Sequence, residues 1–431
     1  MTHRSHRLLT VGSLARVEGE GALHISVRGS RVADIRLEIY EPPRYFEALL
    51  RGRAYTEPPD ITARICGICP VAYQMSACRA VEDACGVTVD GQLAELRRLL
   101  YCGEWIESHT LHVYLLHAPD FLGLPDALAL ARTRPELLKR GLRLKKAGNE
   151  IVERLGGRAI HPINVRLGGF HRLPERAELD RLTAVLRQAR TDAEDTLGWV
   201  AGFEFPELAV GHELLALRGR GGYAIDAGVP YGSRTGAFTA ADFESHVLER
   251  QVPHSTALHA ELDGRRYLTG PLARWSLNGA LLPPPILALA AEAGLGPTCD
   301  NPFRSILVRA VEVLWAVTEA QRIIERYEPP PVPAVPVPPR AGTGHGATEA
   351  PRGLLYHRYQ LDGDGTIRAA TIIPPTAQNQ AAIEADLRTF VQDRLHLDDV
   401  ELTRQCEQAI RNYDPCISCA AHFLDLTVER A

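Results

Sequence analysis

The chain has 431 residues, enough for a large buried core or for two or three merged domains. Hydrophobic residues make up 45% and charged residues 23%, which is ordinary for a globular protein, and the net charge of −5 offers no basic field for nucleic acid. Because no apolar run approaches the roughly 18 residues of a membrane span, and the first residues lack the apolar core of a secretory signal, we expect a cytoplasmic protein without a membrane span.

The sequence pattern of residues 1–60 predicts a β-rich N-terminal part. The segments 22–28 and 31–40 alternate apolar and polar residues on either side of Gly29-Ser30, which is a hairpin signal. The segment 43–53 is predicted to be a short helix that Pro43 opens.

The sequence pattern of residues 61–326 predicts a helical core. Pro70 follows Cys69, and no helix breaker occurs before about Ala84, so a helix is expected over this stretch. Further helices are predicted from apolar residues at helical spacing and from long stretches without breakers, over 93–106, 134–156, 175–200 and 303–324. Helices of this length favour a central bundle with irregular connections.

The remaining chain mixes extended, β and helical segments. Residues 328–340 are too rich in proline for a helix or a sheet interior, and glycines 342, 344 and 346 are expected to continue this loop. Residues 353–373 resemble a hairpin with an Asp-Gly turn, after which the chain returns to helix. The expected fold is a single domain, mainly α with small β elements (α+β), divided into 1–60, a helical 61–326, an extended 327–353, a β/α 354–422 and a tail at 423–431.

Two Cys-x-x-Cys pairs stand near opposite ends of the chain, in "RICGIC" (Cys66, Cys69) and in "DPCISC" (Cys416, Cys419). The first pair lies in the turn before the helix at Pro70, where free backbone N–H groups and the helix dipole favour a thiolate. Four thiolates could hold a structural zinc ion, although the two cysteine pairs of such sites usually lie roughly 15–20 residues apart. A thioredoxin-like redox disulfide is a second alternative, but it would need a βαβ pattern around the cysteines, which the sequence lacks. Nine cysteines without a disulfide-rich pattern suit a reducing compartment, where thiols bind metals or pack as small hydrophobes. A metal held by both pairs would require the whole fold to close around it.

The two motifs resemble the signature motifs of the large subunit of nickel–iron hydrogenases. The segments "ARVEGEG", "PRYFEALLRGR", "HAPDF", "EAPRG" and "PPTAQN" stand in the order that this family shows, so the resemblance covers nearly the whole chain. The details are similar to the cytoplasmic, multimeric branch that couples hydrogen to NAD(P). The resemblance implies reversible heterolytic cleavage of H2 at a nickel–iron centre whose iron carries carbon monoxide and cyanide.

The resemblance also implies how the four cysteines would bind the metals. Cys66 and Cys416 would be terminal ligands of nickel, and Cys69 and Cys419 would bridge nickel and iron. Soft thiolates suit both metals. Tyr73 departs from the commonest pattern, because the family often has histidine at this position, and the difference affects the hydrogen bonding around the first motif.

Other residues match positions that the family uses in catalysis. Splitting H2 releases a proton, which needs a nearby base, and Glu18 in "RVEG" matches the proton-transfer glutamate; without the resemblance it would be an ordinary surface glutamate at a strand end. Arg352 in "EAPRG" matches the arginine placed over the metals, whose guanidinium keeps its charge. Asp120 and Asp414 match the carboxylates that orient this arginine, and Asp414 would also suit a helix N-cap. Thr376 matches the hydroxyl that donates to a cyanide.

A second metal site is implied near the C-terminus. Glu47, the backbone carbonyl of Ile372 and His422 match its ligands, of which the oxygens suit magnesium and the imidazole leaves iron possible. In the family, an endopeptidase removes the C-terminal tail after nickel insertion, so cleavage after His422 is expected.

Electrons from hydrogen have no visible acceptor in this chain. The other cysteines have no ferredoxin spacing and are expected to be buried thiols, and no GxGxxG follows a predicted strand. The acceptors are therefore expected on partners: an iron–sulfur small subunit and flavin and NAD(P) subunits, with maturation factors acting earlier. A hydrogen sensor with the same ligands is an alternative, and a non-catalytic structural metal-binding subunit is disfavoured because all four cysteines are present.

Overall fold

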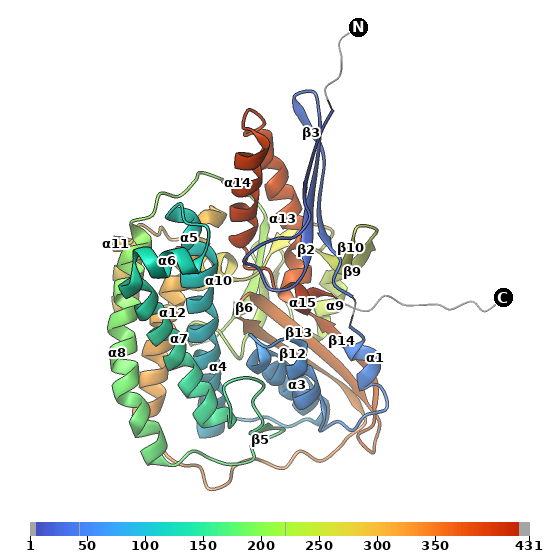
Figure 1. The fold of residues 1–431 in the computed structure, drawn as a ribbon. Coiled ribbons are helices and arrows are strands. Elements are labelled where there is room, and N and C mark those ends of the chain that lie inside the picture. Colours follow the sequence, from blue (N-terminus) through green and yellow to red (C-terminus); the bar gives the residue numbers. More distant parts are fainter. Residues whose placement is uncertain (1–5, 43, 220, 422–431) are drawn as a thin grey trace, which may run out of the picture.

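A computed structural model describes residues 6–42, 44–219 and 221–421. Long helices fill one side of the molecule and small sheets the other (Figure 1). The helices are α1 (Phe46–Leu50), α2 (Pro58–Thr62), α3 (Pro70–Cys85), α4 (Gly91–Leu111), α5 (Ala118–Phe121), α6 (Ala127–Thr133), α7 (Pro135–Gly156), α8 (Arg176–Ala201), α9 (Phe243–His246), α10 (Pro271–Asn278), α11 (Pro284–Glu292), α12 (Ser305–Glu325), α13 (Pro375–Gln392), α14 (Asp399–Arg411) and α15 (Ile417–Ala420). The strands are β1 (His6–Val11), β2 (Gly21–Arg28), β3 (Arg31–Ile39), β4 (Val165–Arg166), β5 (Gly169–Phe170), β6 (Glu213–Arg218), β7 (Val229–Gly232), β8 (Gly236–Ala237), β9 (Val247–Val252), β10 (Ser255–Leu262), β11 (Tyr267–Leu268), β12 (Gly342–Ala350), β13 (Gly353–Leu361) and β14 (Ile367–Ile373).

The predicted helical bundle is confirmed. Helices α4, α7, α8 and α12 cover the segments that were expected from helical spacing and stand side by side in Figure 1. Helices α4 and α7 approach closely through two glycines, since a Cβ on Gly148 would lie 2.6 Å from the carbonyl oxygen of Gly103. A capping box between Glu175 and Glu178 fixes the start of α8. The bundle forms one wall of the large core cluster that also contains the four motif cysteines.

The N-terminal hairpin is also confirmed, with Arg28 paired to Arg31 across a two-residue turn. Strand β1, which lies within the predicted β-rich N-terminal part, adds to it in the antiparallel order β1-β2-β3. Apolar residues of this sheet pack against α13 and α14, near the top of Figure 1. The short helix predicted over 43–53 is α1, which begins at Phe46; its expected opening at Pro43 lies outside the described residues.

A second sheet has the antiparallel order β12-β13-β14 and packs on α3. The hairpin predicted at 353–373 is confirmed as β13 and β14, but the expectation that glycines 342, 344 and 346 continue a loop was wrong. These glycines belong to β12, where small residues let the strand lie directly on the helix: a Cβ on Gly344 would lie 2.0 Å from the carbonyl oxygen of Ala80.

The expected helical core over 61–326 is interrupted by β structure. Strands β6, β7, β8 and β11 form one sheet, and β9 and β10 form a hairpin, all between α8 and α10. The proline-rich segment 328–340 forms neither helix nor strand, as predicted. The fold class of mainly α structure with small sheets is therefore confirmed, with more β structure in the middle of the chain than expected.

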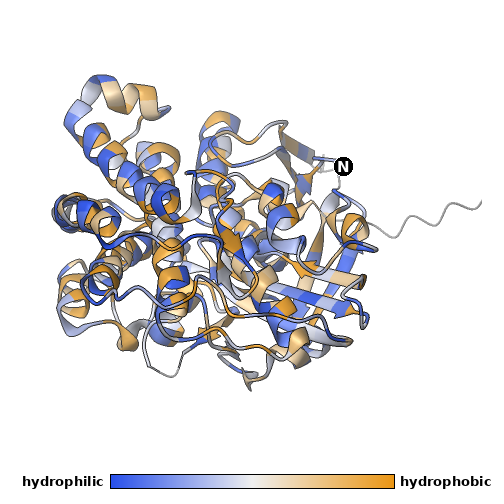
Figure 2. Ribbon diagram, turned by 90° about the horizontal axis from the view of Figure 1, so that it is seen from below, coloured by the Kyte–Doolittle hydropathy of each residue, from blue (hydrophilic) through white to orange (hydrophobic). Residues whose placement is uncertain are grey.

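Polar and apolar residues mix along the helices, as Figure 2 shows from below. Within the described ranges, no helix is both long enough and apolar enough to cross a membrane.

Candidate metal centre

The four motif cysteines meet in the core, although about 350 residues separate the two pairs. The sulfurs of Cys66 and Cys416 lie 3.4 Å apart, those of Cys69 and Cys419 lie 3.6 Å apart, and those of Cys416 and Cys419 lie 2.9 Å apart. All four sulfurs lie within 4.8 Å of one another, and all four residues are buried. The first pair precedes α3, and the second pair starts and occupies α15, so the two ends of the chain close one site.

Glu18 holds the second cysteine pair to the N-terminal part. The backbone N–H of Ile417 donates to the carbonyl oxygen of Glu18 at 2.9 Å. The Glu18 carboxylate then accepts from the Cys416 thiol at 3.1 Å and from the backbone N–H of Ser418 at 3.0 Å. The Ser418 hydroxyl in turn donates to Glu41, at 2.8 Å and 3.0 Å from its two oxygens. Sequence patterns gave no sign of Glu41, which is only partly buried.

The pKa values of the buried thiols are shifted in opposite directions. Hydrogen bonds from Cys416, Cys419 and Cys69 hold the pKa of Cys66 well below its ordinary value, and the backbone N–H of Ile68 donates to its sulfur at 3.3 Å. Burial raises the pKa of Cys416 well above its ordinary value. A cluster of thiols that shares protons in this way is suited to exchange those protons for soft metal ions.

The expected support of Cys69 by the start of α3 was wrong. The first free N–H groups of this helix, on Val71 and Ala72, donate to the carboxylate of Glu104 at 2.6 Å and 3.1 Å. The hydrogen bond with Cys416 lowers the pKa of Cys69, but contacts with Cys419 and Cys66 and burial outweigh it, so the pKa is raised well above the ordinary value. Glu104 comes from α4 and reaches the helix start only in the tertiary structure, so its sequence position carries no signal of this role.

Arg352 lies at the two-residue turn between β12 and β13 and faces the cysteines. Its Nε donates to the carbonyl oxygen of Asp414 at 2.7 Å, and its Nη2 donates to the Asp414 carboxylate at 3.0 Å. Its Nη1 and the second Asp414 oxygen are buried without a hydrogen-bond partner among the described residues. Asp414 has a φ of 49°, and Cys416 is the N-cap of α15, so the N-cap role considered for Asp414 was wrong.

Asp120 does not orient Arg352. Its carboxylate accepts from Arg411 at 2.7 Å and 2.9 Å and also pairs with Arg16. Both arginines satisfy Asp120 in a buried ion-pair network beside the π-helical turn His112–His117. The expected partnership with Arg352 is therefore corrected: Asp414 alone of the two carboxylates binds it.

A small enclosed cavity, with room for about one water molecule, lies beside the sulfurs. Its lining includes Cys69, Tyr73, Arg352, Cys416 and Cys419. Burial, followed by the charges of Cys419 and Cys69, raises the pKa of Tyr73 well above its ordinary value, and its hydroxyl has no hydrogen-bond partner among the described residues.

Thr376, in the first turn of α13, accepts a hydrogen bond from the backbone N–H of Cys416 at 3.0 Å. Its own hydroxyl hydrogen remains available for donation. Within the described part of the chain, Arg352 and Tyr73 have donors without a partner near the sulfurs, and Thr376 has a hydroxyl hydrogen to donate, an arrangement that fits a centre carrying acceptor ligands.

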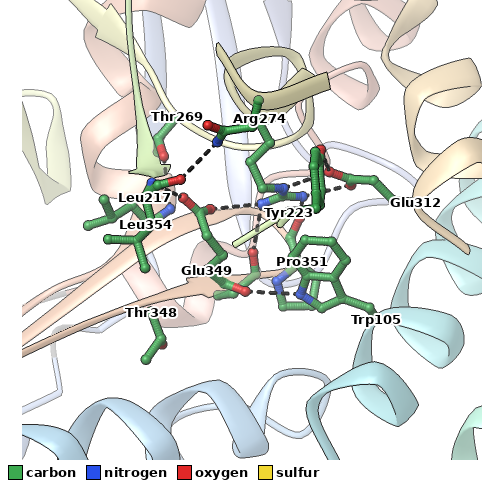
Figure 3. Close-up of polar contacts among 12 residues, drawn as sticks. Trp105, Leu217, Tyr223, Thr269, Arg274, Glu312, Thr348, Glu349, Pro351 and Leu354 are labelled. Carbon is green, nitrogen blue, oxygen red and sulfur yellow. Dashed lines mark hydrogen bonds and ion pairs between the residues drawn. The ribbon is translucent and has the colours of Figure 1, made fainter. Parts of the chain in front are cut away.

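A buried ion-pair network fixes the turn that carries Arg352 (Figure 3). Arg274 of α10 donates to the carbonyl oxygens of Ala350 and Pro351 at 3.0 Å and 2.9 Å. The same guanidinium binds Glu349 at 3.0 Å and Glu312 at 2.7 Å and 2.8 Å. All three charged groups are fully buried, so each depends on the others for compensation.

The predicted second metal site is described only in part. Glu47 accepts a hydrogen bond from the backbone N–H of Ile372 at 2.6 Å, and burial raises its pKa to about 6. His422 lies outside the described residues. Sequence patterns missed Glu249, whose pKa is raised to about 8 by burial and then by the charges of Glu47 and Glu244. Its Oε1 is buried and has no hydrogen-bond partner among the residues that the structure describes. Adjacent carboxylates with an unpaired oxygen fit a hard divalent cation.

The other cysteines are buried and free, as expected. Burial raises the pKa of Cys78 and Cys406 to about 12 and that of Cys299 to about 11, so these thiols stay protonated. Among the described side chains, none of these cysteines joins a group with metal-ligand spacing.

Comparisons with known proteins identify the family of this chain. The family model described as nickel-dependent hydrogenase matches residues 44–155 and 316–422. Sulfhydrogenase 1 subunit alpha of Pyrococcus furiosus is 34% identical over 422 residues, covering 97% of this chain and 98% of that protein. NAD-reducing hydrogenase HoxS subunit beta of Cupriavidus necator is 27% identical, covering 97% and 95%. The crystal structure of an NAD+-reducing [NiFe]-hydrogenase in the H2-reduced state superposes with a TM-score of 0.87 and 26% identity, covering 97% of this chain and all of that chain.

Proposed function

This chain belongs to the nickel-dependent hydrogenase family as a large, catalytic subunit, and from that premise we propose the composition of its centre and the roles of the residues around it. The proposal rests on the four cysteine sulfurs, which lie within 4.8 Å of one another. Cys66, Cys69, Cys416 and Cys419 would hold a nickel–iron centre whose iron carries carbon monoxide and cyanide. When bound, this centre supplies the heterolytic cleavage of H2 to protons and electrons.

Glu18 takes the proton from the sulfur of Cys416. The 3.1 Å contact between these groups supports a direct transfer, because proton transfer requires hydrogen-bond distance. Ser418 donates to Glu18 through its backbone and to Glu41 through its hydroxyl. Because the Glu41 side chain is 20% exposed, the two carboxylates mark a route from the centre toward solvent.

Arg352 and Thr376 hold the iron ligands. Among the described residues, the buried Nη1 of Arg352 has no hydrogen-bond partner, and Thr376, which accepts from Cys416, still has a hydroxyl hydrogen to donate, so cyanide nitrogens would satisfy both donors. Asp414 keeps the guanidinium in place through two hydrogen bonds, and Arg274 holds the turn below it.

Electrons leave this chain for partner subunits. The groups with metal-ligand spacing in the described part of the chain are the cysteine centre and one cluster without sulfur, so an electron relay needs another polypeptide. An iron–sulfur small subunit receives the electrons, and flavin and NAD(P) subunits in the cytoplasm complete the path. The similarity to a protein named as an NAD-reducing hydrogenase supports this acceptor.

Glu47, the carbonyl of Ile372 and His422 would hold a second metal ion, magnesium or iron. Removal of residues 423–431 by an endopeptidase after nickel insertion leaves His422 as the terminal residue. The charged side chains of this tail would be costly to bury unpaired beside the second metal. The intact mass of the active chain checks this: a mass ending at His422 is expected, and a full-length active chain would refute cleavage.

Metal analysis tests the centre itself. The mature chain is expected to contain nickel and iron near one to one, with sulfur ligands at the nickel X-ray absorption edge. Cys66→Ser and Cys416→Ser should each abolish nickel retention and hydrogen activity, because an alkoxide replaces a soft thiolate poorly. Cys78→Ser, at a buried cysteine outside the cluster, is the matched control and should retain nickel. Active protein without nickel would refute the proposal.

A further inference from the structure

A second cluster of metal-binding side chains lies apart from the cysteines. His254 occupies the two-residue turn between β9 and β10, His259 lies in β10, and Glu384 lies in α13. Each offers one ligand atom, and the three atoms lie within 4.8 Å of one another. We propose that these three residues bind a zinc ion that fastens the β9–β10 hairpin to α13.

The cluster is already held in a compact arrangement. Nε2 of His254 lies 2.7 Å from Oε1 of Glu384, and this oxygen also accepts a hydrogen bond from the backbone N–H of Leu37 at 2.8 Å. The rings of His254 and His259 lie 5.6 Å apart and are nearly perpendicular. Tetrahedral ligands at roughly 2.0–2.2 Å from zinc are about 3.3–3.6 Å from one another. Movements of about 1 Å in these side chains therefore suffice to admit the ion.

His259 distinguishes this cluster from an ordinary ion pair. Elsewhere in the chain, His24 and Glu38 form a simple pair at 2.6 Å without a third ligand. His259 is 3% exposed, and its Nε2 is buried without a hydrogen-bond partner among the described residues. An unpaired buried nitrogen is costly unless a ligand occupies it.

The site is separate from the second metal site near Glu47. In the β9–β10 hairpin, His259 pairs with Arg250, whereas Glu249 pairs with Ala260. Because neighbouring residues in a strand point to opposite faces, His259 and Glu249 lie on opposite faces of the hairpin. Glu249 is the residue that interacts with Glu47, so the histidines face away from that carboxylate cluster.

The donor set favours zinc. Two imidazoles and one carboxylate suit zinc, whereas a magnesium site is built from oxygen donors. The side chains of His254 and Glu384 are 20% and 17% exposed, so water can reach the fourth position. An ion here would also act on the cysteine centre indirectly, because α13 carries Thr376 and β10 pairs at Ala257 with Ala421, next to α15.

Zinc titration of the nickel-loaded holoenzyme tests this site. Enzyme purified without a histidine tag and dialysed against chelator is titrated with Zn²⁺, and zinc and nickel are counted per chain. One zinc beyond the nickel and iron is expected, with only nitrogen and oxygen ligands at the zinc X-ray absorption edge. Because losing a group that merely supports a ligand already weakens metal affinity roughly 10- to 100-fold, His259→Gln should weaken zinc binding at least about 100-fold.

His254→Gln, at the partly exposed ligand, should weaken zinc binding similarly, and this variant guards against misfolding of the buried one. His24→Gln is the matched control and should bind zinc like the wild type. Equal zinc affinity in the wild type and both cluster variants, or sulfur ligands around the zinc, would overturn the inference. Nickel content should stay constant in all of these variants, so a failure of the nickel centre would be recognised separately.

Discussion

Replacing Glu18 by glutamine isolates the proton step. Oε2 of Glu18 accepts from two groups, the Cys416 thiol at 3.1 Å and the Ser418 N–H at 3.0 Å. A glutamine oxygen at the same place can accept both bonds, so the fold and the metals should be retained, but an amide cannot carry the proton away. General acid–base catalysis contributes typically about 10²–10⁴-fold, which corresponds to roughly 2.7–5.5 kcal/mol of barrier.

Hydrogen–deuterium exchange at constant nickel content measures this effect. Glu18→Gln should lower the exchange rate by about 10²–10⁴-fold. Glu18→Asp should be intermediate, because the carboxylate withdraws by roughly 1.5 Å, one carbon–carbon bond, and then needs a bridging water. Glu20→Gln is the control, since Glu20 is exposed in the same segment. Near-normal exchange in a fully nickel-loaded Glu18→Gln enzyme would show that another group carries the proton.

Three further changes test the surroundings of the centre. Arg352→Lys should retain nickel but lose about 10²-fold or more of exchange activity, because the planar fork that binds Asp414 is lost; a mild effect would exclude this role. Arg274→Met should destabilise the chain by roughly 3–5 kcal/mol, because Glu312 and Glu349 lose the buried arginine that they pair with, and the thermal midpoint should fall by about 3–6 °C. Arg404→Met, which removes a surface ion pair, is the control and should shift the thermal midpoint little. Gly344→Ala should destabilise the protein by about 1–3 kcal/mol, because the added Cβ would clash with backbone atoms of α3. Gly12→Ala is the control, because a Cβ there would have no neighbour within 4 Å among the described residues, and equal denaturation midpoints of the two variants would contradict the prediction.

Local patterns determined much of the architecture. Helical spacing located α4 and α12, Pro70 located the start of α3, and Gly29-Ser30 located the first hairpin, because each signal depends on residues within a few turns or strands of one another. The four cysteines could be assigned to one site because two short motifs identify a family whose centre they form. No spacing rule brings together residues about 350 positions apart without that resemblance.

Tertiary structure decided the contacts that complete the sites. Gly344 became part of a strand because α3 lies against it, although glycine favours loops in isolation. Glu104 reached the start of α3, and Asp120 paired with Arg411 rather than Arg352, because helices distant in sequence pack together. The same holds for His259 and Glu384, whose proximity depends on a hairpin meeting a helix more than 100 residues later. Hydrophobic periodicity and capping signals determine structure within one helix or strand. The partners named above are instead determined by tertiary packing, because a buried charge or hydrogen-bond donor is costly unless it is paired.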